Sequence, residues 1–414
     1  MTTGVVLTGL GAICSIGADT AAFGQALRTG TCGFAQVTDE FADEGVRLLA
    51  PLRGFGYDAA IDRAGLPSAE RDAVRRAGRR EVVALQATIA ACAQAWADAG
   101  LHARPVAAER IGVVVGGHNL TQRYTYEQHA RAGPDMGHVL PRYALQSQDT
   151  HLVATISEAF GIHGEGFTVG ASSASGNAAV IMAARMVACG ALDACLAVGA
   201  MTQLEPAMYA ALDRLGVLAA GILQTAPRPL DRERAGLVPG EAAACVVLES
   251  WPSTRRRGAV PVAELAGVAQ VLDGNALPNP NVFGESRAMA KALADALVTS
   301  DQVGYINAHA TATPAGDDAE AEAIATVFAS AQPWVNATKG LIGHCLGTAG
   351  VIETVATAIQ IAGGFLHPNP NLRAPISTRL RHVGTAAIDM EVGYALSNSF
   401  GFGGFNSSIV LRKP

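Results

Sequence analysis

The stretch FTVGASSASGNAA, residues Phe167–Ala179, decides the fold prediction. The apolar run Phe167–Val169 precedes a segment of alanine, serine and glycine, which predicts a buried strand that turns sharply into a buried helix. Small side chains let a ligand approach the N-terminus of such a helix, where free N–H groups and the helix dipole favour negative charge. Ser173 lies at the turn, which is a usual position for a nucleophile.

Apolar segments of strand character alternate with alanine-rich segments of helical character on both sides of this stretch. This alternation predicts an α/β fold. We expect a glycine-containing turn over 11–17 after the first strand, and Gly100 as the C-cap of a helix. The expected strands are 4–10, 111–117, 193–200, 245–248, 304–307, 335–336 and 408–411, and the expected helices are 81–100 and 174–189.

The chain divides into two predicted halves, residues 1–251 and 259–414, at the polar stretch PSTRRRG (252–258). In the second half, the expected strand at 335–336 leads to a glycine-rich elbow, GLIGHCLGTAG (340–350), which opens an apolar helix. An elbow in each half is what a duplicated strand–helix unit predicts.

Composition excludes several classes of function. The 414 residues are 50% hydrophobic and 16% charged, which is typical of a packed globular enzyme. The net charge of −6 argues against nucleic-acid binding. None of the seven cysteines forms a CxxC pair, so we expect neither a metal site nor a disulfide framework. We see no signal peptide and no long uninterrupted apolar run, so we expect a cytoplasmic protein without a membrane segment.

Four motifs, each weak alone, together resemble the β-ketoacyl synthases of the thiolase superfamily in order and spacing. The resemblance covers essentially the whole chain, from TGLGAICSIG (8–17) onward. The four motifs are the segment around Ser173, NAHATATPAGDDAEAEA (307–323) with His309, NATKGLIGHCLGTAG (336–350) with Lys339 and His344, and NSFGFGGFN (398–406).

The resemblance implies a thiolase-like, five-layered αβαβα sandwich made of two pseudo-duplicated halves, usually a homodimer. It also implies that the substrate is an acyl group on the 4′-phosphopantetheine arm of an acyl carrier protein, and that the enzyme has no cofactor or metal of its own.

The resemblance assigns the central residues by position. His309 and His344 match the two catalytic imidazoles, which would donate hydrogen bonds to the carbonyl oxygen of a malonyl thioester. Lys339 and Glu320 match a supporting pair that holds the second elbow and its imidazole, and Asp317 matches a structural position.

Other matching positions would contact the substrate. Thr311 and Thr313 match threonines that contact the pantetheine arm, and Phe402 matches a gating phenylalanine. Phe405 stands where elongating enzymes carry threonine, so it either narrows the acyl channel or only packs.

Two segments have open interpretations. The polar, aromatic segment HNLTQRYTYEQHA (118–130), which includes Asn119, is either a surface or dimer-interface loop or a lid over the acyl pocket. The basic segment RDAVRRAGRR (71–80) is either a solvated helix face or a patch that meets the acidic carrier protein.

The most informative departure is Ser173, because the family's cysteine nucleophile falls on this position. A serine hydroxyl needs an adjacent base, and none is obvious in the local sequence. Elongation requires a loaded thioester on the enzyme, whereas decarboxylation requires only the two imidazoles and a site for malonyl. The chain therefore resembles the stand-alone decarboxylating ketosynthases of polyketide β-branching cassettes, which convert malonyl- to acetyl-acyl carrier protein. The alternatives are a condensing enzyme with a serine nucleophile and a non-catalytic subunit like a chain-length factor.

Overall fold

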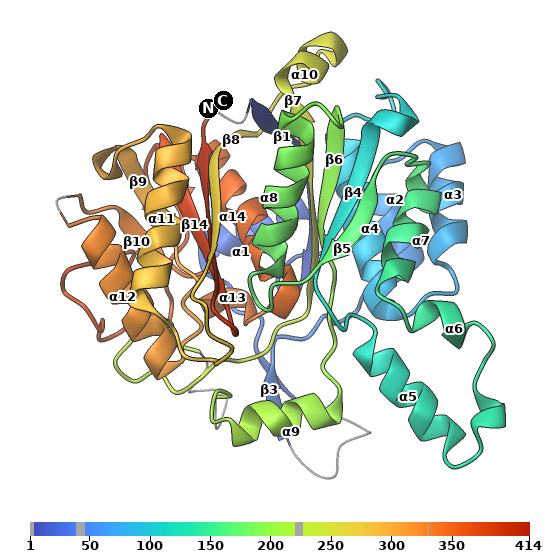
Figure 1. The fold of residues 1–414 in the computed structure, drawn as a ribbon, viewed down its shortest axis with the longest axis horizontal. Helices are drawn as coiled ribbons and strands as arrows, with labels where there is room; N and C mark the ends of the chain where they lie inside the picture. The colour runs from blue at the N-terminus through green and yellow to red at the C-terminus, as the bar shows by residue number, and fades with distance from the viewer. Residues whose placement is uncertain (1–3, 39–45, 220–226, 330) are drawn as a thin grey trace.

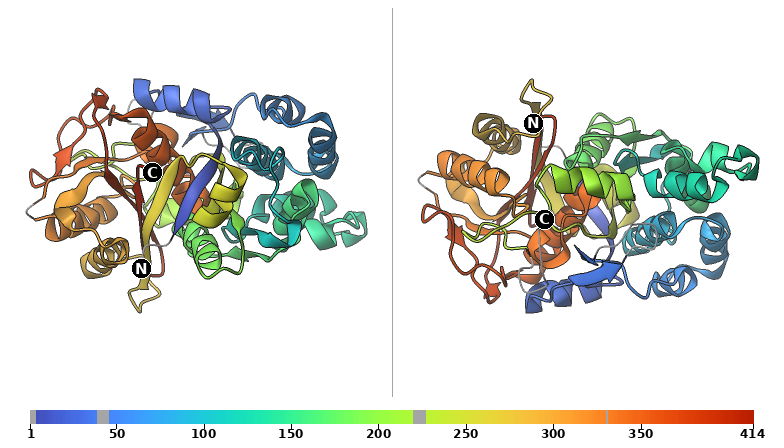
Figure 2. Two further views of the ribbon diagram at one scale, coloured as in Figure 1. Left: turned by 90° about the horizontal axis from the view of Figure 1, so that it is seen from above. Right: turned by 90° about the horizontal axis from the view of Figure 1, so that it is seen from below.

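The computed structural model describes residues 4–38, 46–219, 227–329 and 331–414, whose elements stack in five layers (Figure 1). The helices α8 (Ser175–Ala188) and α14 (Ala349–Gly363) form the central layer. Strands lie on both sides of these two helices, and further helices cover the outer face of each set of strands (Figures 1 and 2). The predicted α/β class and the αβαβα layering are confirmed.

The strands of both layers belong to one mixed sheet. Within the described ranges it has eleven strands in the order β12-β10-β9-β14-β15-β8-β1-β7-β6-β4-β5. Strand β1 joins the two sets, because it pairs antiparallel with β7 on one side and with β8 on the other. The bounds are β1 (Val5–Cys14), β4 (Ile111–Gly116), β5 (Gly166–Val169), β6 (Ala194–Gly199), β7 (Ala242–Ser250), β8 (Ala263–Leu272), β9 (Val303–Asn307), β10 (Trp334–Asn336), β12 (Arg381–His382), β14 (Tyr394–Gly401) and β15 (Phe405–Arg412).

Helices pack on both outer faces of the sheet. On the first-half strands, α4 packs on β1 and β7, and α7 packs on β4. On the second-half strands, α11 packs on β8 and β15, and α12 packs against α11. The bounds are α1 (Thr20–Thr29), α2 (Tyr57–Arg63), α3 (Ser68–Gly78), α4 (Val83–Asp98), α5 (Gln122–Ala132), α6 (Tyr143–Gln146), α7 (Thr150–Phe160), α9 (Pro206–Arg214), α10 (Trp251–Arg257), α11 (Val282–Ala296), α12 (Pro314–Val327) and α13 (Lys339–Ile342). Two short strand pairs, β2 (Ala35–Thr38) with β3 (Val46–Leu49) and β11 (Phe365–Leu366) with β13 (Ile388–Asp389), lie outside the main sheet.

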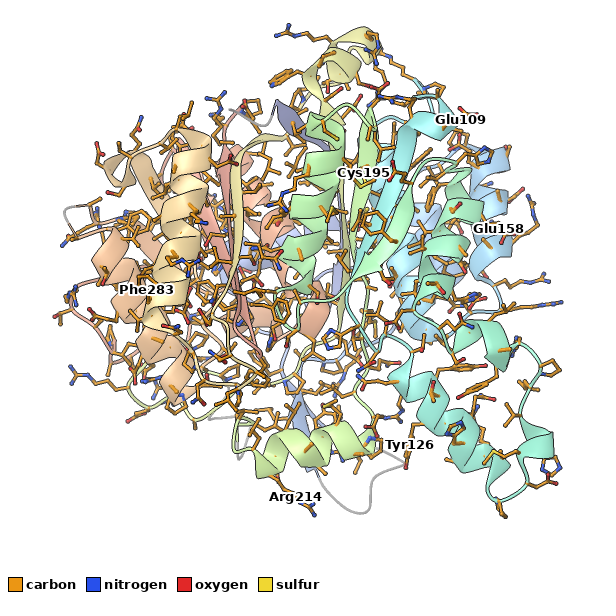
Figure 3. All side chains as sticks on the ribbon, in the orientation of Figure 1. Glu109, Tyr126, Glu158, Cys195, Arg214 and Phe283 are labelled. Atoms are coloured by element: carbon orange, nitrogen blue, oxygen red, sulfur yellow. The ribbon has the colours of Figure 1, made fainter. Side chains whose placement is uncertain are left out.

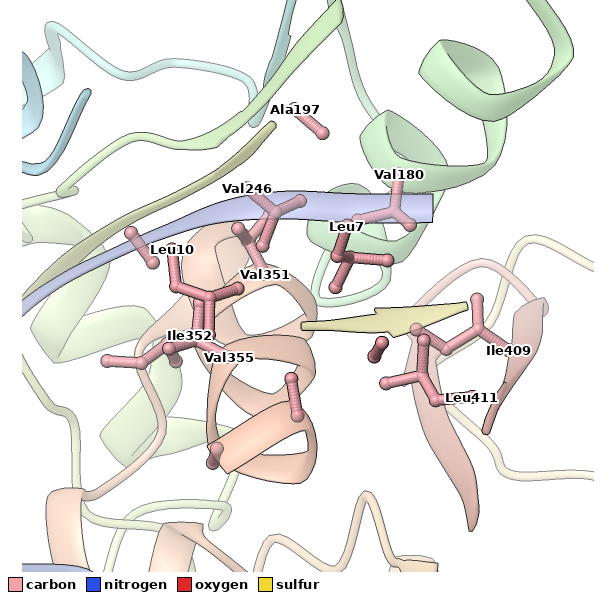
Figure 4. Packing of buried hydrophobic residues seen from close by; sticks show 14 of the residues in the cluster. Leu7, Leu10, Val180, Ala197, Val246, Val351, Ile352, Val355, Ile409 and Leu411 are labelled. Carbon is pink, nitrogen blue, oxygen red and sulfur yellow. The ribbon is translucent and has the colours of Figure 1, made fainter. Parts of the chain in front are cut away.

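The central helices are apolar nearly all round because strands cover them from both sides. Val180 of α8 and Val351 of α14 belong to the same buried cluster as Leu7 of β1 and Val246 of β7 (Figure 4). Leu346–Gly363, which contains α14, is the one described helical segment apolar and long enough to cross a bilayer, and 78% of it is buried in the protein. Its composition therefore follows from its place in the core.

Two glycines let the central helices meet. A Cβ atom at Gly176 would lie 2.7 Å from the backbone nitrogen of Val351, and one at Gly350 would lie 2.3 Å from that of Asn177. Neither position has room for a side chain. Because these glycines lie in the two elbow motifs, the contact fixes the two elbows against each other.

The expected elements appear with small shifts in their bounds. The largest is in the first strand, since β1 continues to Cys14, where it still pairs with Ala242 of β7. The chain turns only between Cys14 and Gly17, so the turn predicted over 11–17 begins too early. Gly100 follows α4 with φ 64°, as expected for a residue that ends a helix.

The stretch 252–258 is not an extended linker. It forms most of α10, whose N-cap is the Ser250 side chain. The strands before and after α10 belong to the same sheet. We keep the halves 1–251 and 259–414 as a proposed description of two duplicated units.

The basic segment 71–80 lies largely on α3 and is partly neutralised by its own neighbours. An Arg75 nitrogen lies 2.6 Å from an Asp62 carboxylate oxygen and another lies 3.5 Å from Asp58, and Arg71 lies 3.9 Å from Asp62. These pairs favour the solvated-face interpretation over a patch reserved for a carrier protein.

Candidate active site

Side-chain hydrogen bonds pin the first elbow between β5 and α8. The Ser175 hydroxyl donates to the carbonyl of Ser172 at 2.6 Å and accepts from the N–H of Ala171 at 2.8 Å. Ser172 has φ 52°, a left-handed conformation that is rare for serine and that marks a strained turn. The Ser399 hydroxyl donates to the carbonyl of Ser173 at 3.1 Å. The result is a fixed backbone at Ser173, which lies at the tip of the elbow.

The fold brings Ser173, His309 and His344 together. Ser173 Oγ lies 2.8 Å from His344 Nε2, although the two residues are far apart in sequence. The rings of His309 and His344 meet edge to face, with centroids 5.5 Å apart. All three residues line one cavity of about 610 Å³. The local sequence showed no base beside Ser173, but the tertiary structure places an imidazole there.

His309 has a defined tautomer. Lys339 Nζ lies 3.2 Å from His309 Nδ1. An ammonium group can only donate, so Nδ1 accepts and the proton of the neutral ring is on Nε2. Burial, the charge of Lys339 and the neighbouring His344 all hold the pKa of His309 well below its ordinary value. At neutral pH, His309 is therefore a neutral ring with an N–H donor at Nε2.

His344 is neutral as well, but the protein fixes its tautomer less strictly. Burial, and then the charge of Lys339, hold its pKa well below the ordinary value. Its Nδ1 atom is buried without a hydrogen-bond partner in the part of the chain that the structure describes. The Ser173 hydroxyl can therefore donate to Nε2 or accept from it.

Lys339 and Glu320 interact electrostatically, as expected for a supporting pair, but they do not support the second elbow together. Lys339 forms a buried ion pair with Glu353 of α14, and these side chains are 2% and 1% exposed. A single acidic residue in the apolar helix after the second elbow was the available signal, because a fully buried carboxylate requires a partner. Lys339 contacts the ring of His309, not that of His344.

Glu320 holds the first imidazole by its backbone. Its carboxylate accepts from the N–H of His309 at 2.9 Å, from the N–H of Ala310 at 2.7 Å and from the amide of Asn398 at 3.0 Å. The prediction that Glu320 holds the second elbow is therefore corrected. Glu320 supports the loop that carries His309.

Asp317 has a structural place, as expected. It is fully buried and accepts from the N–H groups of Leu230 at 2.7 Å and Ala312 at 3.0 Å. Burial raises its pKa to about 7. It does not line the cavity and instead fastens the loop before α12 to the segment around Leu230.

Three predicted contact residues line the cavity. The hydroxyls of Thr311 and Thr313 lie 2.9 Å apart on its wall. Phe402 also lines it and is 41% exposed, which places this ring at the boundary with solvent. The position of Phe402 is suited to a gate.

Phe405 does not line the cavity. Its ring packs against a small buried cluster formed by Ala171, Ala174 and Ala178, beneath the first elbow. The expectation that it narrows the acyl channel is thus corrected in favour of packing, because its side chain supports the elbow from the β15 side.

The segment 118–130 was expected to be either a lid over the acyl pocket or a surface or dimer-interface loop, and each interpretation fits a different part of it. Asn119, which has φ 52°, and Gln122 line the cavity. The rest of the segment continues into α5, which projects from the body of the molecule beside α6 (Figure 1). The start of the segment, up to Gln122 at the first residue of α5, shapes the cavity, and the later residues of α5 are not part of its lining.

The motifs did not indicate several other lining residues. Met208 and Leu212 of α9 form an apolar part of the wall, and Glu285 of α11 contributes a buried carboxyl. The described residues contain no group of three or more side chains suited to a metal ion.

Comparisons with known proteins identify the family of the chain. The family model "Beta-ketoacyl synthase, N-terminal domain" matches residues 2–252, and "Beta-ketoacyl synthase, C-terminal domain" matches residues 262–373. The polyketide biosynthesis malonyl-ACP decarboxylase PksF of Bacillus subtilis is 33% identical over 414 residues, which cover 99% of this chain and 96% of that protein. The 3-oxoacyl-(acyl-carrier-protein) synthase 2 of Vibrio cholerae is 31% identical over 430 residues, 99% of each chain.

A solved structure supports the same assignment. A β-ketoacyl synthase from Burkholderia phymatum STM815 superposes with a TM-score of 0.83 at 28% identity, covering 99% of each chain. The whole length of the chain is thus accounted for, and this chain belongs to the β-ketoacyl synthase family.

Proposed function

We propose that this protein decarboxylates malonyl-acyl carrier protein to acetyl-acyl carrier protein in polyketide biosynthesis, as the name of its Bacillus relative states for that protein. The observation that carries the proposal is the cavity itself. Two neutral imidazoles with intact supports face a serine at the position of the family's cysteine.

The imidazoles act on the oxygen of the thioester carbonyl. Loss of CO₂ from malonyl leaves an enolate, whose negative oxygen requires hydrogen-bond donors. His309 supplies Nε2–H, and His344 supplies Nε2–H in the tautomer in which Ser173 Oγ accepts from it. A preorganised donor aimed at such an oxyanion contributes roughly 3–4 kcal/mol. The reaction needs no acyl-enzyme.

The same geometry disfavours a serine nucleophile. His344 Nε2 cannot accept the proton of Ser173 and donate to the enolate oxygen at the same time. A ring whose pKa is held low is also a weak base. Among the described residues, its Nδ1 has no acceptor of the kind that orients the base in serine hydrolases. The Ser173–His344 contact is nevertheless the one observation that favours the condensing alternative.

The substrate and assembly complete the proposal. The malonyl group would enter past Phe402 on the phosphopantetheine arm of its carrier protein, with Thr311 and Thr313 along the arm. We propose a homodimer in the cytoplasm. We propose that it uses no cofactor other than the phosphopantetheine arm of the carrier protein. Strand β5 is the last strand in the sheet order and is a natural place for a second copy.

Mass spectrometry of malonyl-loaded carrier protein after incubation tests the proposal. We expect conversion to the acetyl form with no mass added to the enzyme. A covalent acyl group on Ser173 together with a carbon–carbon bonded product would instead establish the condensing enzyme. Turnover that appears only with a second ketosynthase subunit would establish the chain-length-factor alternative.

A further inference from the structure

Glu285 lies in the first half of α11, on the face turned toward the site. It lines the same cavity as His309. Met289, about one turn or 5.4 Å farther along the helix, contacts the Asn398 amide, which in turn donates to Glu320. Phe283, two residues before Glu285, points outward and is 68% exposed (Figure 3). The helix therefore directs Glu285 inward, toward the residues that hold His309.

The carboxyl of Glu285 lacks the partners that a buried acid usually has. The side chain is 2% exposed, and its Oε2 atom has no hydrogen-bond partner within the described residues. Burial, followed by the nearby carboxylates Glu320, Asp273 and Asp317, raises its pKa well above the ordinary value. This setting favours the protonated form of the carboxyl group.

The neighbouring acidic side chains of the cavity, Glu320 and Asp273, accept hydrogen bonds from N–H groups. Glu320 accepts three N–H hydrogen bonds, and Asp273 accepts from the Asn406 amide at 2.9 Å. Burial raises the pKa of Glu320, and its three hydrogen bonds oppose that rise. Glu285 differs from both, because its Oε2 oxygen accepts no hydrogen bond from the described residues.

The proposed reaction requires a proton that the imidazoles do not provide. Decarboxylation breaks the bond between the carboxylate and the methylene carbon, CO₂ leaves, and the electron pair remains as an enolate. Acetyl forms only when that carbon gains a proton. The two neutral rings use their Nε2–H groups on the enolate oxygen. In that tautomer the Ser173 hydroxyl accepts from His344, and an alcohol is a much weaker acid than the carboxyl group of Glu285.

We infer that Glu285 supplies this proton, an inference that rests on the proposed decarboxylation. The O–H bond of the carboxylic acid breaks, a C–H bond forms on the enolate carbon, and Glu285 is left as a carboxylate. Because Oε2 has no donor and three other carboxyl groups are near, that carboxylate takes a proton back from water. One turnover thus consumes one proton from solvent.

The test uses Glu285→Gln, which keeps the shape of the side chain and removes the acid. We expect acetyl-carrier formation to fall by about 10²-fold, within the range for general acids, mainly in kcat. We also expect the variant to return more label to malonyl in buffer containing ¹³CO₂, because a longer-lived enolate can recapture CO₂. Its melting temperature should not fall, because the substitution removes a buried acid with an unpartnered oxygen.

Controls separate this inference from its rivals. Lys291→Gln, on the exposed face of the same helix, should match wild type in all three measurements. If Glu285→Gln lowers acetyl formation, label return and melting temperature together, Glu285 is structural and the inference is wrong. If Ser173→Ala raises label return and Glu285→Gln does not, serine is the proton source. Absence of acetyl formation in wild type would instead reject the proposed function.

Discussion

The two elbows of this molecule have the same construction and different chemical content. Each follows a short strand and opens a central helix, and the two helices touch at Gly176 and Gly350. The first elbow presents Ser173 and is fastened by hydroxyl–backbone bonds, chiefly those of Ser175. The second presents His344 and is fastened by the buried Lys339–Glu353 pair, which joins it to His309.

The difference shows which elbow the chemistry depends on. The first has kept its frame but carries oxygen where the family has sulfur. The second elbow has kept both its supporting ion pair and its imidazole, and the rings of His309 and His344 are neutral. The reaction expected from the cavity is thus the half-reaction that the second elbow performs with His309.

The largest effect, a loss of folding stability, should follow from removing the ion pair that holds the second elbow. Lys339→Met leaves Glu353 buried without its cation, which typically costs about 3–5 kcal/mol. Urea unfolding should show that loss. Ser175→Ala in the first elbow should cost only about 1–3 kcal/mol, because it removes neutral hydrogen bonds.

A double variant controls for the ion pair. Lys339→Met with Glu353→Leu replaces both charges by apolar groups and should recover most of the stability. If the single variant is as stable as wild type, the pair does not hold the elbow and the contrast between the two fastenings is lost.

Removal of either imidazole should produce the next largest effect. His309→Ala and His344→Ala should each lower acetyl-carrier formation by about 10²–10³-fold, because each removes one donor to the enolate oxygen. Mass spectrometry of the carrier protein measures the rates, and circular dichroism checks that the variants fold. Undiminished turnover in either variant would contradict the mechanism.

Sequence reasoning predicted the layers, both elbows and the three residues Ser173, His309 and His344 that meet in the cavity, because these depend on local pattern and motif order. It missed Glu353 and misassigned Glu320, because the choice among buried carboxylates is made by tertiary contacts. The resemblance placed His344 in the site, but the local sequence did not show that its ring contacts Ser173, since the two residues come from different halves of the chain. Glu285 lies outside every motif, and only its burial and its place in the cavity distinguish it.

A smaller effect is expected at the first elbow. Ser173→Ala should lower acetyl-carrier formation by less than about tenfold, or roughly 1.4 kcal/mol, because the hydroxyl is a neighbour of His344 and not a donor of its own to the enolate oxygen. Steady-state rates compared with those of His344→Ala give the answer. A loss as large as that of the histidine variant would show that the two elbows act as one catalytic unit.

The smallest effect concerns pH and tests whether the imidazoles work as neutral donors. An ordinary imidazole becomes charged as the pH falls through about 6.5, but burial and Lys339 hold the pKa values of His309 and His344 well below that value. The value of kcat/KM should therefore stay level as the pH falls from about 7.5 through 6.5, and decline only in more acidic buffer. A decline centred near 6.5 would mean that an unshifted imidazole controls the rate. A rise in acid that persists in Glu285→Gln, which lacks the proposed general acid, would mean that the reaction uses imidazolium.

The lowered pKa values of His309 and His344 also predict that folding stability falls as the pH falls. Below about pH 6.5 the unfolded chain binds protons at these histidines and the folded protein does not, so their contribution to stability is lost as the pH falls toward the folded pKa values. Urea unfolding at pH 7 and 5.5 measures the change. Asp317 and Glu285, whose pKa values are raised, change stability in the opposite direction in both wild type and His309→Asn. The difference between the two proteins isolates the histidine: the variant should lose less stability on acidification than wild type, and an equal loss would place the pKa of His309 at its ordinary value.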